Sequence, residues 1–273
     1  MFDLSTLLPL VGLLVVTSAF AGLIAGLLGV GGGIVLVPAF LFTFETLGYG
    51  SPQVMQICLA TSLATIIVTS MRSVLSHNKK GAVEWPILRA WAPGIAVGAL
   101  IGVMIAARLR SDFLQALFGC IAIGIGLYFA FGRRHWRLSG QMPTGVLRAA
   151  LSPMVGFLSV LMGIGGGSFA VPLMTLCSVP MHRAVATAAG FGVLIAVPSV
   201  LAFLFVPVPA EVRPPATLGS VNIGAFAIAI SMTLITAPLG AKLAHSVEEK
   251  TLRRAFAVFI LAVALNMLRK ALF

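Results

Sequence analysis

The chain has 273 residues, of which 59% are hydrophobic and only 9% are charged. Soluble domains carry about 25% charged residues, so most of this chain must be surrounded by lipid rather than water. The net charge of +11 does not indicate nucleic-acid binding. Residues 1–71 contain no Lys or Arg, and the basic residues then cluster in short gaps between apolar runs, as in the cytoplasmic loops of membrane proteins.

The first apolar run raises the question of a signal peptide. Residues 7–16 resemble a signal-peptide core, and residues 19–21 resemble a cleavage site. However, the preceding residues carry Asp3 and no basic residue, and the run continues into a motif that recurs in the second half of the chain. We therefore expect this segment to stay in the mature protein.

Ten apolar runs follow one another along the chain, at 5–28, 33–47, 53–71, 86–107, 113–131, 146–162, 168–179, 184–206, 219–241 and 252–268. A helix that spans a bilayer needs about 20 residues, and most of these runs are long enough or nearly so. The sequence therefore predicts an all-α integral membrane protein with about eight to ten hydrophobic helices.

Two glycine-rich cassettes, at residues 29–38 and 163–172, share the pattern G-x-G-G-G-x-x-x-V-P. In a helix each glycine costs about 1 kcal/mol relative to Ala, and the closing proline lacks the N–H that a regular helix needs. We expect each cassette to break its helix and to form the tip of a helical hairpin, either re-entrant or made of two short spans.

The cassettes are part of a longer internal repeat. Residues 55–61 align with residues 181–187, which pairs Thr61 with Thr187. A motif that recurs once per half of an apolar chain is typical of transporters with duplicated repeats. The expected organisation is a first transmembrane repeat at 1–132, a cytoplasmic linker at 133–148 and a second transmembrane repeat at 149–273.

The charge of the gaps predicts their sides. The gaps at 72–89, 133–148 and 242–254 are rich in Lys and Arg and should be cytoplasmic, whereas the gap at 207–218 should be outside. If each cassette hairpin returns to the side it started from, each five-segment half makes an odd number of crossings. The second repeat is then inverted relative to the first, the N-terminus is outside, and the two cassettes meet near the midplane.

The cassettes are the first candidates for a substrate site. A broken helix leaves backbone N–H groups unpaired at the start of the next half-helix, and these groups favour an anion. The expected cradle consists of Gly31, Gly32, Gly33, Gly165, Gly166, Gly167 and Ser168. The alternative is that the glycines only allow helices to pack closely.

Side chains that follow each cassette are further candidates. Thr61, Thr65, Thr69 and Arg72 lie on one helix face at spacings of four, four and three residues. Their hydroxyls could bind an oxyanion, although Thr in a helix often bonds its own backbone. The candidates here are Gln56, Thr61, Ser62, His182, Arg183 and Thr187, of which the two basic ones could instead mark the membrane interface.

Other chemistry is not visible in the sequence. No Asp or Glu lies deep in an expected span, so no carboxylate proton relay is evident. The three cysteines lie in apolar stretches and do not suggest disulfides. Since metal-ligand clusters, nucleophile motifs and ATPase signatures are also missing, we expect no catalytic activity, no metal and no cofactor.

The paired cassettes in an apolar chain of this length resemble the sulfite exporter TauE/SafE family over essentially the whole sequence. The resemblance implies a multi-pass permease of the plasma (inner) membrane for sulfur-containing anions such as sulfite and organosulfonates. It implies no site residue beyond the cassettes. The expected partners are therefore a small anionic substrate and the lipid bilayer, and the sequence leaves open whether the protein is a monomer or a homodimer.

The membrane potential favours one direction of transport. Moving one charge across the membrane is worth roughly 2.3 kcal/mol per 100 mV, so an inside-negative potential alone can drive anion export. We therefore expect export by alternating access. Two alternatives are proton-coupled uptake of a related anion through His182 and a membrane scaffold that transports nothing.

Overall fold

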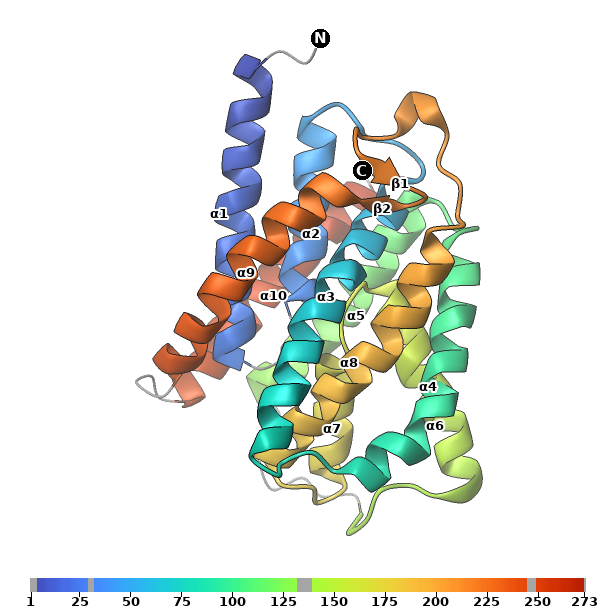
Figure 1. The fold of residues 1–273 in the computed structure, drawn as a ribbon, viewed down its shortest axis with the longest axis vertical. Helices are drawn as coiled ribbons and strands as arrows, with labels where there is room; N and C mark the ends of the chain where they lie inside the picture. The colour runs from blue at the N-terminus through green and yellow to red at the C-terminus, as the bar shows by residue number, and fades with distance from the viewer. Residues whose placement is uncertain (1–3, 29–31, 132–138, 245–248, 273) are drawn as a thin grey trace.

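The computed structural model describes residues 4–28, 32–131, 139–244 and 249–272 (Figure 1). In these ranges the chain forms ten α-helices: α1 (Leu4–Leu28), α2 (Gly33–Thr46), α3 (Val54–Lys79), α4 (Trp85–Ala106), α5 (Ser111–Phe131), α6 (Gly145–Leu161), α7 (Gly167–Leu176), α8 (Met181–Phe203), α9 (Ile223–Ala244) and α10 (Glu249–Leu272). Each apolar run of the sequence corresponds to one of these helices.

Six of the described helices are long and apolar enough to cross a membrane: α3, α4, α5, α8, most of α9 and most of α10. Shorter apolar stretches lie in α1, α2, α6 and α7. Large hydrophobic side chains are exposed on the outer helices, where a soluble protein would carry charge. The chain is therefore an all-α protein of the multi-pass membrane class, as its composition predicts.

The cassette prolines lie inside helices, contrary to the expectation that they would discourage a regular helix. Pro38 is within α2 and Pro172 is within α7. A proline inside a helix removes one backbone hydrogen bond, but membrane helices tolerate this when neighbouring helices surround them. Most residues of α2 are buried, so the surrounding protein holds it in place.

Two connections between helices are partly structured. Helix α6 begins at Gly145, so the end of the expected 133–148 linker is already helical, while residues 132–138 lie outside the described residues. The Pro-rich gap before α9 contains a short 3-10 helix (Ala210–Val212) and a small antiparallel hairpin, β1 (Thr217–Leu218) with β2 (Val221–Asn222). Gly219 at the turn has a φ of +56°, which glycine adopts without strain.

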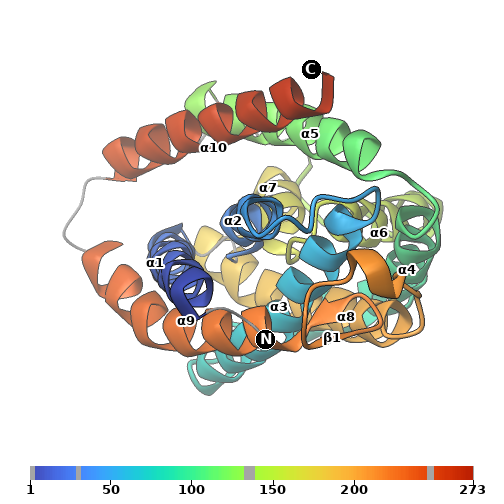
Figure 2. The same ribbon diagram turned by 90° about the horizontal axis from the view of Figure 1, so that it is seen from above.

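The main helix contacts join the two halves of the chain. Helix α1 packs along α9, α4 along α6, α5 along α10, and α3 along α8. Figure 2 shows α2 and α7 near the middle, with α1 and α9 on one side and α5 and α10 along another edge. If each helix of α1–α5 is exchanged with the helix five positions later, the same four pairs result: α1–α9 becomes α6–α4, and the pairs α3–α8 and α5–α10 map onto themselves. Neither half therefore buries its helices without the other.

Small residues allow the closest of these contacts. A Cβ on Gly98 of α4 would collide with the carbonyl oxygen of Pro153 in α6, and a Cβ on Gly156 would collide with the carbonyl oxygen of Ile95. Glycine on both helices thus brings the two backbones together, as is common in membrane proteins. Next to this seam, the rings of Trp91 (α4) and Phe191 (α8) stack with centroids 6.2 Å apart.

Candidate functional site

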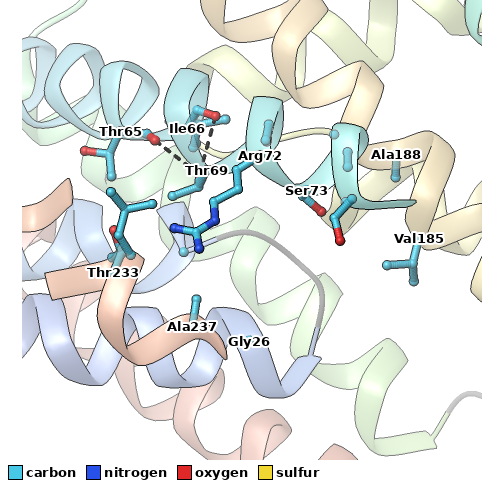
Figure 3. A pocket seen from close by; sticks show the side chains of 18 of the residues that line it. Gly26, Thr65, Ile66, Thr69, Arg72, Ser73, Val185, Ala188, Thr233 and Ala237 are labelled. Carbon is cyan, nitrogen blue, oxygen red and sulfur yellow. Dashed lines mark hydrogen bonds between the residues drawn. The ribbon is translucent and has the colours of Figure 1, made fainter. Parts of the chain in front are cut away.

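A cavity of about 470 Å³ lies among α1, α2, α3, α7, α8 and α9 (Figure 3). Its lining includes the C-terminal half of α3, from Thr65 to His77. This half leads to the α3–α4 connection at the lower end of Figure 1, which is the side that the loop charges predict to be cytoplasmic.

Both cassettes contribute to this cavity. Gly32 lines it from the first cassette, and Gly165, Gly166 and Gly167 line it from the second. Because Gly32 directly precedes α2 and Gly166 directly precedes α7, both helices begin at the cavity. The unpaired N–H groups and the positive dipole ends of two helices therefore lie beside the same space.

The cassettes also touch each other. A Cβ on Gly33 would collide with the carbonyl oxygen of Gly163, and Gly163 itself has a φ of +60°. The hydroxyl of Ser62 on α3 donates a hydrogen bond of 2.7 Å to the same Gly163 carbonyl. The second cassette is thus held between α2 and α3. Gly31 lies outside the described residues.

The glycines differ in what they allow. A Cβ on Gly166 would lie 2.7 Å from the Cβ of Phe191, so close packing requires glycine there. A Cβ on Gly165 would have its nearest neighbour, on Ile66, at 3.4 Å, which is ordinary contact. Packing therefore explains Gly33 and Gly166, whereas Gly165 leaves space in the cavity that a side chain would fill. Ser168 is buried and is not part of the lining.

Helix α3 presents a polar face to the cavity, made of Thr65, Thr69, Ser70, Arg72, Ser73, Ser76 and His77. The hydroxyls of Thr65 and Thr69 donate to the carbonyl oxygens of the residues four positions earlier, each at 3.1 Å. They are therefore already used as donors, which is the alternative that the sequence suggested for threonine. The serines make no hydrogen bond to the described residues and are free to donate.

Sequence reasoning missed these three serines and His77. Ser70, Ser73 and Ser76 recur every three residues, so they lie on one side of α3 beside the threonine stripe. This three-residue spacing is the sequence feature that could have identified them as a second polar row on α3. Serine is a weak indicator of a binding site, however, because it is also common in membrane helices where they pack closely.

Arg72 is the permanent positive charge of the described lining. Figure 3 shows its side chain extending from α3 into the cavity, toward Thr233 and Ala237 of α9. Neither Asp nor Glu occurs among the described residues of the lining. The cavity is consequently electropositive, and it suits an anion better than a cation or a neutral molecule.

Thr61 and Thr187 do not line the cavity. Both are fully buried, and each accepts a hydrogen bond from a backbone N–H of the opposite half. Thr61 accepts from Asn222 at 3.0 Å, and Thr187 accepts from Glu84 at 2.9 Å. Asn222 directly precedes α9 and Glu84 directly precedes α4, so the two threonines make equivalent contacts.

The remaining expected site residues are also away from the cavity. The side-chain amide of Gln56 donates to the carbonyl oxygens of Ala106 and Leu109, where α4 ends. Arg183 forms an ion pair with Glu84, and His182 is exposed. Of the residues expected to contact substrate, the structure thus brings Gly32 and Gly165–Gly167 to the cavity. Gly33 and Ser62 are not part of the lining and lie against the Gly163 carbonyl instead.

Long apolar helices around a cavity that carries Arg72 and a row of hydroxyl groups are typical of an integral membrane protein of the transporter class. A family model for the sulfite exporter TauE/SafE matches residues 14–267, nearly the whole chain. The chain belongs to this family.

Individual relatives carry the same kind of name. A probable membrane transporter protein of Haemophilus influenzae is 28% identical over 258 residues, covering 94% of this chain and 98% of that protein. Another, from Methanocaldococcus jannaschii, is 25% identical and covers 92% of each chain. The probable membrane transporter protein YunE of Bacillus subtilis is 31% identical over 64% of this chain and 71% of its own length. No solved structure matches the chain significantly.

Proposed function

We propose that the protein exports a small sulfur-containing anion, such as sulfite or an organosulfonate, across the plasma (inner) membrane. The observation that carries the proposal is that glycines of both cassettes line one electropositive cavity. Two helix N-termini directed at that cavity favour an anion over other solutes. Membership of the sulfite exporter family supports sulfur oxyanions as the substrate class.

Alternating access would follow from an inverted repeat of the two halves. Three observations support this arrangement: the packing pairs are unchanged when the halves are exchanged, α3 and α8 run in opposite directions (Figure 1), and Thr61 and Thr187 make equivalent contacts. In such transporters the substrate site lies between the repeats near the midplane, and one repeat rocks against the other. The anion would sit between the cassettes.

The membrane potential favours export of an anion over its uptake. An inside-negative potential drives an anion outward without a coupling ion, at roughly 2.3 kcal/mol per charge per 100 mV. The described lining lacks carboxylates, and His77 is the one side chain in it that could take part in a proton relay. His182, which a proton-coupled importer would use, is exposed and is not part of the lining.

The test is efflux of radiolabelled sulfite and methanesulfonate from proteoliposomes, with a potassium–valinomycin potential of either sign. We expect efflux to accelerate when the interior is negative. Gly165→Val should block it, because a Cβ at this position meets no backbone atom closer than 3.9 Å and the added side chain takes up cavity space. Gly12→Val is the matched control, since Gly12 has open space around it on α1. Absence of flux under both potentials for both anions would refute the proposal.

A further inference from the structure

We propose that Arg72 binds the anionic group of the substrate, and that it supplies the charge which the glycine cassettes lack. The identity of the transported anion rests on the proposed function, but binding at Arg72 does not require transport. The cassettes would then shape the space around the anion, and α3 would bind it.

The position of Arg72 along α3 argues for this role. It lies about two turns, or roughly 10 Å, before the end of the helix at Lys79. Lys79 and Lys80 therefore provide the basic residues at the membrane interface. Arg72 is not needed for that role, so its position calls for another explanation. Instead of turning back to the helix end, the Arg72 side chain extends into the cavity (Figure 3).

Among the described residues, Arg72 has no ion-pair partner. The ion pairs within the described parts of the chain are Arg110–Asp112, Arg183–Glu84 and Lys270–Glu45. The rest of the lining is largely apolar, with Leu36, Ile66, Leu234 and Pro238 among its members. The Arg72 side chain is exposed, so an anion can reach it. The apolar lining favours the pair, because each charge replaces part of the other's hydration.

Guanidinium chemistry fits the oxyanion class. Its planar fork donates two parallel hydrogen bonds to two oxygens of one group, which a sulfite or sulfonate group presents. Ser76 lies one turn further along the same face of α3, so its free hydroxyl can donate to a third oxygen. The threonines nearby are already bonded to their own helix.

The second half of the chain has no equivalent charge. The alignment that pairs Thr61 with Thr187 places Pro198 opposite Arg72. Pro198 lies inside α8 and carries no donor. The positive charge therefore comes from only one half of the chain, which is consistent with a single anion site.

The first experiment measures binding rather than flux. Purified protein is titrated with sodium methanesulfonate and with sodium sulfite at constant ionic strength, in the wild type, Arg72→Gln, Arg72→Lys and Arg89→Gln. Arg89 is the matched control, because it is exposed at the same end of the molecule, with its guanidinium carbon 5.8 Å from the Trp85 ring, and is not part of the lining.

We expect Arg72→Gln to weaken binding by roughly 10- to 100-fold, as for the loss of a charge-assisted pair. Arg72→Lys should retain part of the affinity, and Arg89→Gln should stay within about twofold of the wild type. Wild-type affinity in a folded Arg72→Gln protein overturns the proposal.

A second measurement needs no variant. Wild-type protein is modified with phenylglyoxal, with and without methanesulfonate, and the modified arginines are mapped by mass spectrometry. We expect methanesulfonate to protect Arg72 but not Arg89, and equal modification of Arg72 in both samples overturns the proposal even if Arg72→Gln fails to fold. Protection without flux in proteoliposomes would refute the exporter and leave the anion site standing. Flux without protection would refute the Arg72 site alone.

Discussion

The side-chain oxygen of Thr187 accepts a hydrogen bond of 2.9 Å from the backbone N–H of Glu84, the residue directly before α4. The equivalent bond in the other half joins Thr61 to the N–H of Asn222, just before α9. Each threonine thus satisfies a donor that the start of a helix leaves unpaired. The two bonds lie toward opposite ends of the molecule and connect its halves.

Removal of the Thr187 hydroxyl should destabilise the protein. Thr187→Val keeps the shape but leaves the Glu84 N–H without its partner, at a cost of roughly 1–3 kcal/mol. Thr187→Ser keeps the acceptor and should cost less. Thermal unfolding in detergent measures both, and Thr61→Val with Thr61→Ser provides the equivalent pair. A Thr187→Val melting temperature equal to that of wild type would contradict a structural role for this bond.

The ion pair beside this bond should contribute little. The side chains of Arg183 and Glu84 are 45% and 26% exposed. Exposed pairs are screened by water and salt, so Arg183→Gln should cost less than about 1 kcal/mol of unfolding free energy. Because Arg183 is not part of the cavity lining, the Arg183→Gln protein should bind methanesulfonate with the same affinity as the wild type. A large loss of methanesulfonate affinity in Arg183→Gln would place this residue in the binding site after all.

Ser62 should position the second cassette. Ser62→Ala removes the hydrogen bond to the Gly163 carbonyl in a fully buried place, which should cost about 1 kcal/mol and slow anion efflux. Ser231→Ala is the control, since Ser231 is exposed and its hydroxyl bonds only its own helix, at Ala227. If both variants transport equally and unfold at the same temperature, the bond to Gly163 has no positioning role.

Gly33 should not tolerate a side chain. A Cβ there would collide with the Gly163 carbonyl, and it would lie 2.9 Å from the Ile164 Cα. Because backbone cannot yield as a flexible side chain does, Gly33→Ala should cost at least about 1–3 kcal/mol. Gly12→Ala, with open space around it, should be neutral or slightly stabilising. The yield of monodisperse protein and its melting temperature measure the difference.

Local features of the amino-acid chain were enough to predict the class of the protein and its helical segments. These predictions came from apolar runs, glycine breaks and clustered basic residues. Each such pattern depends only on its own stretch of chain, because it reflects the free energy of placing that stretch in lipid, in a helix or in water. Ten runs became ten helices, and the cassettes fell at helix starts. The stripe from Thr65 to Arg72 was also predicted to share a face, since helical periodicity is a property of the chain alone.

The role of each polar group, by contrast, depends on how the helices pack together. Thr61 and Thr65 both belong to the predicted stripe, yet Thr61 bonds the start of α9 while Thr65 lines the cavity. Likewise, Gly165 leaves open space whereas Gly166 is packed against Phe191. A hydroxyl or a glycine has no intrinsic preference between such roles. The outcome depends on which other helix packs against it. That contact is distant along the chain: Asn222 is 161 residues from Thr61, and Phe191 is 25 residues from Gly166.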